Sequence, residues 1–174
     1  ALRAISCRSA ASTHGSQIQP PSLSTMNLAD RAATFLGKGI KEIAGPSSHP
    51  QILAWLKRTE SLYPTDLTID DSKYAWCGVF VGNMVLDERA THPALPAPPK
   101  YFQAAANWKA WGTAVEFKNA QRGDVVVLTR PGGYHVAILS GITHDGIKVI
   151  GGNQSDSLSI AEQLWKRVVA IRRG

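Results

Sequence analysis

The hydrophobic pattern of this chain changes its period at Gly112. Before this residue, apolar side chains recur at helical spacing; after it, β-branched runs alternate with short turns rich in glycine, aspartate and proline. Strands joined by short turns pair antiparallel, because a parallel pair needs a long crossover connection. Helices followed by hairpin-linked strands predict an α+β domain, with N-terminal helices packed on an antiparallel β-sheet.

Four helical segments are expected before the change of period. Asn27 is the predicted N-cap of the first, with Gly37 and Gly39 at its end, and Pro50 is the first residue of the second. Proline-rich residues 93–99 separate the last two, because neither a helix nor a central strand continues through such a run. The third and fourth segments are expected over 76–89 and 101–111.

The second half of the chain predicts a series of strands. Gly151 to Gln154 is expected to break the chain after the third of them, and 157–165 fits either a strand or a helix, of which we favour the strand. The other strands are expected over 125–128, 134–139, 147–150 and 168–172.

The chain of 174 residues is long enough for one domain with its own hydrophobic core. Residues 1–25 contain no acidic residue and six serines, so we interpret them as a disordered extension or a cloning remnant, and 26–174 as the single domain. No run reaches the roughly 18 apolar residues of a membrane span, and no secretory signal is visible. Cys7 and Cys77 are not expected to form a disulfide, and we expect a monomer.

The net charge of +6 and pI of about 9.6 favour an anionic partner. No block of Lys and Arg interleaved with aromatic residues is present, so nucleic acid is not an expected partner. The histidines and cysteines lack the spacing of metal ligands, so we expect neither a metal nor another cofactor.

Cys77, His135 and Asn153 form the candidate catalytic set. Cys77 stands at the start of an apolar helix, whose N-terminus favours the thiolate. His135 begins one predicted strand and Asn153 follows the end of the next, so both fall at the same edge of an antiparallel sheet. If the Cys77 helix packs across that edge, the set fits acyl transfer, with His135 as base and the Cys77 backbone N–H as oxyanion donor. The alternatives are a packed cysteine, a structural histidine and a turn asparagine.

Four motifs in order resemble the CHAP and NlpC/P60 superfamily of papain-like cysteine peptidases and amidases, in particular a small phage- and prophage-associated subgroup. The resemblance covers about residues 27–173 and implies Cys77 as nucleophile and His135 as base. Many CHAP members carry Glu two residues before the third catalytic residue; here that place is Gly151, so a Cys-His-Asn triad is expected. The motifs are W-C-G-x-F-V at 76–81, G-D-V-V at 123–126, G-Y-H-V-A at 133–137 and G-G-N-Q-S at 151–155.

The resemblance implies a hydrolase that cleaves amide bonds in the peptide stems or crosslinks of bacterial peptidoglycan. We expect an endolysin-like enzyme acting on the cell wall or in the periplasm, released by lysis, carried by a virion or exported by other means. The alternatives are a non-catalytic wall-binding or virion structural module on the same fold, and a secreted antibacterial amidase effector. The predicted substrate-binding residues are Tyr74, Trp76, Gly133 and Tyr134.

Overall fold

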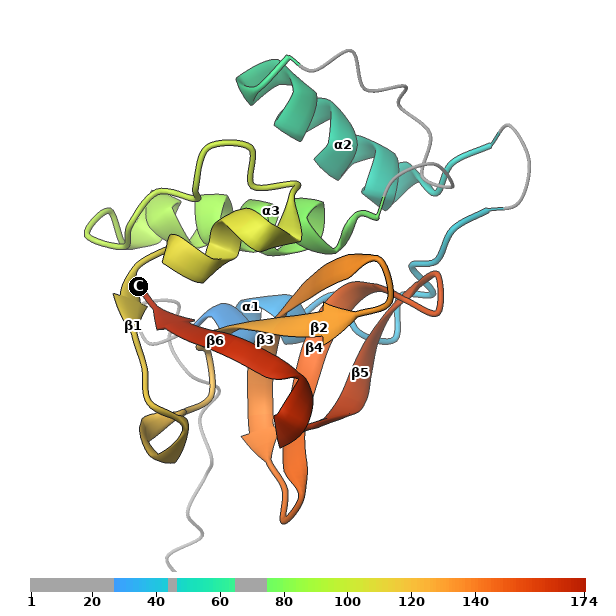
Figure 1. The fold of residues 1–174 in the computed structure, drawn as a ribbon. Helices are drawn as coiled ribbons and strands as arrows, with labels where there is room; N and C mark the ends of the chain where they lie inside the picture. The colour runs from blue at the N-terminus through green and yellow to red at the C-terminus, as the bar shows by residue number, and fades with distance from the viewer. Residues whose placement is uncertain (1–26, 44–46, 65–74) are drawn as a thin grey trace, which may run out of the picture.

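The computed structural model describes residues 27–43, 47–64 and 75–174. It has the predicted α+β architecture: helices lie over one face of a six-stranded antiparallel sheet (Figure 1). The α-helices are α1 (Leu28–Ala33), α2 (Pro50–Leu62) and α3 (Cys77–Thr91), and the 3-10 helices are η2 (Ala105–Ala110), η3 (Phe117–Asn119) and η4 (Trp165–Arg167). The strands are β1 (Thr113–Ala114), β2 (Val125–Arg130), β3 (Gly133–Ile142), β4 (Gly146–Gln154), β5 (Ser157–Leu164) and β6 (Val168–Arg173).

The helix starts follow local capping chemistry. Asn27 accepts hydrogen bonds from the backbone N–H groups of Ala29 and Asp30, at 2.9 and 3.1 Å, and the Asp30 carboxylate accepts one from the Asn27 N–H. This reciprocal capping box satisfies N–H groups that have no partner inside α1. Pro50 opens α2, as predicted, with the His49 side chain accepting from the N–H of Gln51.

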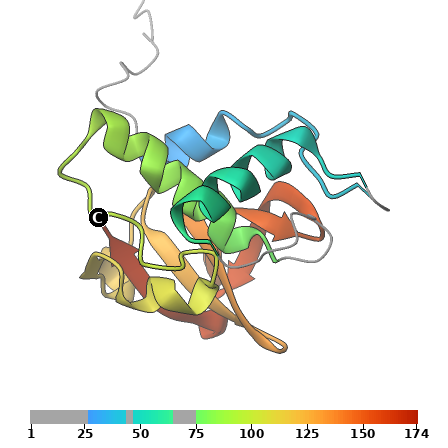
Figure 2. The ribbon, with the colours of Figure 1, turned by 90° about the horizontal axis from the view of Figure 1, so that it is seen from above.

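The strands lie in the order β1-β6-β2-β3-β4-β5. Hairpins connect β2 to β5 in succession, and β6 returns to pair with the free side of β2. Viewed from above, α1 and α2 lie on the same side of α3 (Figure 2), which contacts both of them as well as β3 and β4. Helix α3 therefore packs on the antiparallel sheet through β3 and β4.

Three local predictions need correction. Residues 151–154 do not break the chain: β4 continues to Gln154, because Gly151 pairs with Ser159 and Gln154 with Ser157 on β5, with an irregularity between the two pairs. The helix expected over 101–111 is the shorter 3-10 helix η2, and the first helix ends at Ala33, ahead of the glycines. The strand preferred over 157–165 is confirmed as β5, and β1 was not predicted.

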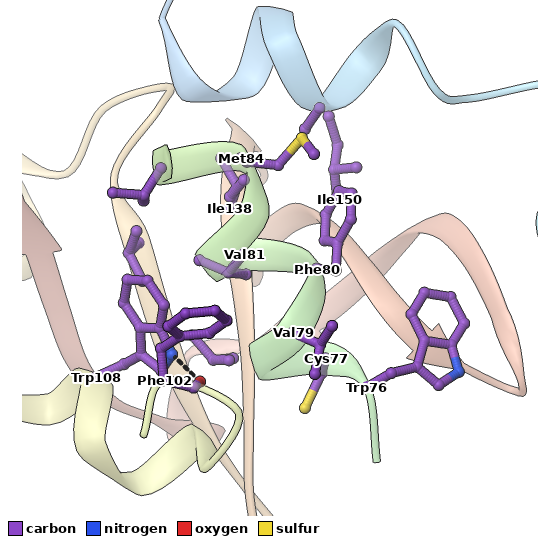
Figure 3. Packing of buried hydrophobic residues seen from close by; sticks show 14 of the residues in the cluster. Trp76, Cys77, Val79, Phe80, Val81, Met84, Phe102, Trp108, Ile138 and Ile150 are labelled. Atoms are coloured by element: carbon purple, nitrogen blue, oxygen red, sulfur yellow. Dashed lines mark hydrogen bonds between the residues drawn. The ribbon is translucent and has the colours of Figure 1, made fainter. Parts of the chain in front are cut away.

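Side chains on the two faces of the sheet enter separate clusters. Val136 and Ile138 of β3 pack with the helices in the first cluster, whereas Ala137 and Leu139 belong to the second, on the opposite face. This is the alternation expected of a strand buried on both sides. Figure 3 shows part of the first cluster around α3, including the hydrogen bond from the Trp108 indole to the Phe102 carbonyl, at 2.7 Å.

Helix α3 approaches its neighbours closely at two glycines. A Cβ added to Gly78 would lie 2.4 Å from the carbonyl oxygen of Phe102 and 2.5 Å from that of Gln103. A Cβ on Gly82 would lie 2.1 Å from an atom of the Phe102 ring. The segment before η2 thus packs directly on the backbone of α3.

We predict that Gly78→Ala destabilises the protein by about 1–3 kcal/mol, because the added methyl group meets backbone carbonyls that cannot rotate away. In an unobstructed helix the same change would stabilise by up to about 1 kcal/mol. Urea unfolding of the purified variant measures the difference. Gly141→Ala is the control: a Cβ there meets nothing within 4 Å, so its stability should change by less than about 0.5 kcal/mol. Equal stability of the two variants would contradict the packing described.

Candidate active site

Cys77 is the first residue of α3, and its side chain is buried (Figure 3). Burial raises the pKa of the thiol, and this effect exceeds the lowering by the backbone N–H of Val136, the charge of Arg130 and the N–H groups of Gly78 and Cys77. The helix position therefore does not lower the pKa of this thiol below its ordinary value in the structure. The donors are present as expected, but the loss of solvation outweighs them.

His135 lies on β3, one residue before Val136, and is also buried. Its Nε2 has no hydrogen-bond partner. A Cβ on Gly151 would lie 3.1 Å both from this Nε2 and from the Cβ of Ala137. Because Ala137 belongs to the second cluster, the imidazole lies on the face of the sheet that points away from α3.

The surroundings of His135 keep its imidazole neutral. Burial, followed by the charge of Arg130, lowers its pKa to about 4, with a smaller contribution from Arg167, while Gln154 opposes the shift. A neutral imidazole can accept a proton, but at this pKa it is a weak base at neutral pH. Arg130 acts on both groups: it favours the Cys77 thiolate and disfavours the His135 imidazolium.

Asn153 stands near the end of β4 with a φ of 55°, in the left-handed region that Asn tolerates. It lines the same cavity of about 220 Å³ as His135 and Gln154. The Gln154 amide donates to the Ser159 carbonyl at 2.6 Å, which holds its side chain beside the imidazole. Sequence reasoning missed Gln154 as a site residue, because it ended the strand before this residue.

The structure brings His135 and Asn153 together, but it does not bring the Cys77 thiol to them. The sulfur lies at the β3 backbone, by the N–H of Val136, and outside the cavity. No hydrogen bond joins the thiol to the imidazole in the described part of the chain. The physical reason is the pleat: adjacent residues of a strand point to opposite faces of the sheet.

The predicted substrate-binding residues occupy different environments. Trp76 is fully buried, and its indole donates to Glu42 at 2.8 Å, so this side chain supports the core. Tyr134 is half-buried, with the Lys109 ammonium 4.2 Å from its ring, and Gly133 is exposed beside it at the start of β3. Tyr74 lies outside the described residues.

Across residues 27–43, 47–64 and 75–174, no group of three or more His, Cys, Asp and Glu side chains is arranged to hold a metal ion. Neither a scan of protein-family models nor a search of curated proteins gives a match to this sequence.

The burial of His135 predicts a pH-dependent stability. Its pKa is about 4 in the folded protein and about 6.5 when unfolded. Between these values the unfolded chain binds more protons, so stability falls as the pH falls. We expect a loss of about 2 kcal/mol between pH 7 and pH 5 from this residue.

Urea unfolding of wild type and His135→Gln at both pH values isolates this contribution, since carboxylates titrate in both proteins. The variant should lose about 2 kcal/mol less than the wild type on acidification. His144→Gln, at a side chain that is 96% exposed, controls for the removal of a histidine. Parallel pH profiles for wild type and His135→Gln would show that the imidazole is not held neutral by burial.

Proposed function

We propose that this protein is a cysteine-dependent peptidase or amidase of bacterial peptidoglycan, with a papain-like fold of the CHAP and NlpC/P60 type. The observation that carries the proposal is the position of Cys77: it begins α3, which packs on the antiparallel sheet, and its sulfur lies at the backbone N–H of Val136, next in sequence to His135. The order of nucleophile, base and polar third residue matches the resemblance.

In the proposed reaction the Cys77 sulfur attacks an amide carbonyl of a peptide stem or crosslink. His135 accepts the thiol proton and delivers it to the leaving amine, and a thioester to Cys77 remains. Water, deprotonated by His135, then releases the acid and restores the thiol. The N–H groups of Cys77 and Gly78 at the start of α3 are available to stabilise the oxyanion.

Two changes must precede this chemistry. The thiol, now 1% exposed, must be uncovered so that an amide carbonyl can reach it. The imidazole must move to the side of β3 that faces α3, where the sulfur lies. The second change requires the β3 backbone at His135 to rearrange, because the pleat fixes the face of the sheet to which each residue points.

The substrate class rests on the resemblance and is supported by charge. The net charge of +6 suits the anionic bacterial wall as well as other polyanions. None of the helices in the described ranges has the length and apolar character needed to cross a bilayer. An antibacterial effector would use the same chemistry, and a cognate immunity protein would identify that role.

The burial of Cys77 and the raised pKa of its thiol favour a second candidate function. On this alternative the protein is a non-catalytic wall-binding or virion structural module, and Cys77 contributes only packing. The two candidates differ in whether the thiol is required for bond cleavage, which two experiments decide.

The first experiment measures the release of soluble muropeptides from insoluble peptidoglycan. Cys77→Ala and Cys77→Ser should reduce release by at least about 10³-fold, because the nucleophile is absent. Cys7→Ser should retain wild-type release, and thermal melting should show that all three variants fold. Mass spectrometry of the products identifies the bond. Wild-type release by a folded Cys77→Ala variant would remove the hydrolase from consideration.

The second experiment follows alkylation by iodoacetamide in a Cys7→Ser background. Because the thiol is buried, we expect Cys77 in the native protein to react at least about tenfold more slowly than in urea. Peptidoglycan fragments should accelerate the reaction if the enzyme uncovers its nucleophile when substrate binds. A slow rate that fragments leave unchanged favours the binding module.

A further inference from the structure

A second feature of the His135 region is independent of Cys77. On the face of the sheet away from α3, the cavity of about 220 Å³ is bordered by two guanidinium groups, those of Arg130 and Arg167. The remaining polar lining consists of His135, Asn153, Gln154, Ser155 and Gln163, and no Asp or Glu contributes to it.

The two arginines of this cavity, of which Arg130 is exposed, have no carboxylate beside them in its lining. Arg167 donates to the Thr129 carbonyl and to Gln163, which are uncharged, and Arg130 forms no ion pair within the described part of the chain. The larger cavity, of about 420 Å³, provides the contrast. There the buried Glu88 and Asp124 are paired with arginines, at 2.6 and 2.7 Å respectively.

The buried Nε2 of His135 belongs to a side chain that lines the smaller cavity. His135 is 6% exposed. Its Nε2 forms no hydrogen bond of normal geometry, although the Gln154 side chain is close enough to raise the pKa of the imidazole. Buried polar atoms are nearly always hydrogen-bonded, so a group bound in the cavity can complete the hydrogen bonding of this nitrogen. The ring borders the cavity together with the two arginines.

We propose that this cavity binds a small oxyanion, the carboxylate or phosphate group of a ligand, through Arg130, Arg167 and the Nε2 of His135. Guanidinium groups bind carboxylates and phosphates through paired N–H donors. The volume corresponds to about seven water molecules, which admits an oxyanion with a few attached atoms. Once an anion offsets the two arginines, the Nε2–H of His135 donates to it, and the pKa of the imidazole rises from about 4 towards its usual value.

The test follows the imidazole signals of His135 by NMR at pH 6, as inorganic phosphate or acetyl-dialanine is added. Each anion that binds should change the chemical shifts of these signals until they saturate. The anion that binds more tightly shows whether the site prefers a phosphate or a carboxylate. Acetyl-dialanine amide, in which an uncharged amide replaces the C-terminal carboxylate, should not shift these signals. Arg130→Gln should weaken binding by about tenfold, because one charged donor is lost.

Two variants serve as controls. Arg122→Gln removes the same charge from another cavity, where Arg122 pairs with Asp30 at 2.7 Å, and it should bind like the wild type. Cys77→Ala should also bind like the wild type, so the result is separate from any hydrolytic activity. The proposal is overturned if neither anion displaces the signals saturably, if Arg130→Gln binds as tightly as wild type, or if the amide reproduces the effect of the carboxylate.

Discussion

The burial of α3 on almost every side is the constraint on which the rest of the structure depends. Every residue from Cys77 to Val85 is buried. A helix that is apolar all round cannot lie on a surface, so it needs a neighbour in each direction. One side of α3 packs on the sheet, and α1 and α2 also contact this helix. The segment before η2 packs against α3 at Gly78 and Gly82.

The polar side chains of this helix are satisfied by the same neighbours. The Asn83 amide donates to the carbonyls of Val79 and Trp55, at 2.9 and 3.3 Å, and so connects α3 to α2. Glu88 accepts a hydrogen bond from Arg31, in the last turn of α1, at 2.6 Å. Because an unpaired polar group is costly in a core, these contacts favour one rotation of α3, and that rotation directs Cys77 at β3.

The sequence predicted those parts of the fold that depend on local chemistry. Asn27 and Pro50 predict the starts of two helices, and the turns after Gly112 predict hairpins. The continuation of β4 through Gly151 and Gly152 was not predictable in this way, because it depends on pairing with β5 and on the Trp76 ring, which lies 2.4 Å from where a Cβ on Gly152 would be. For the candidate site, the spacing predicted that His135 and Asn153 lie at the same end of neighbouring strands. It did not predict the face of the sheet to which each side chain points.

The position of Arg130 connects the two faces of β3. Its charge lowers the pKa of the thiol on one face and that of the imidazole on the other. An anion that offsets this charge makes the imidazole easier to protonate and the thiol harder to ionise. Neutralising Arg130 therefore cannot by itself create a thiolate–imidazolium pair. The larger obstacles are the burial of both groups and their position on opposite faces of β3, so the step that would activate Cys77 is solvation of the thiol or a rearrangement of β3 that brings the imidazole to it.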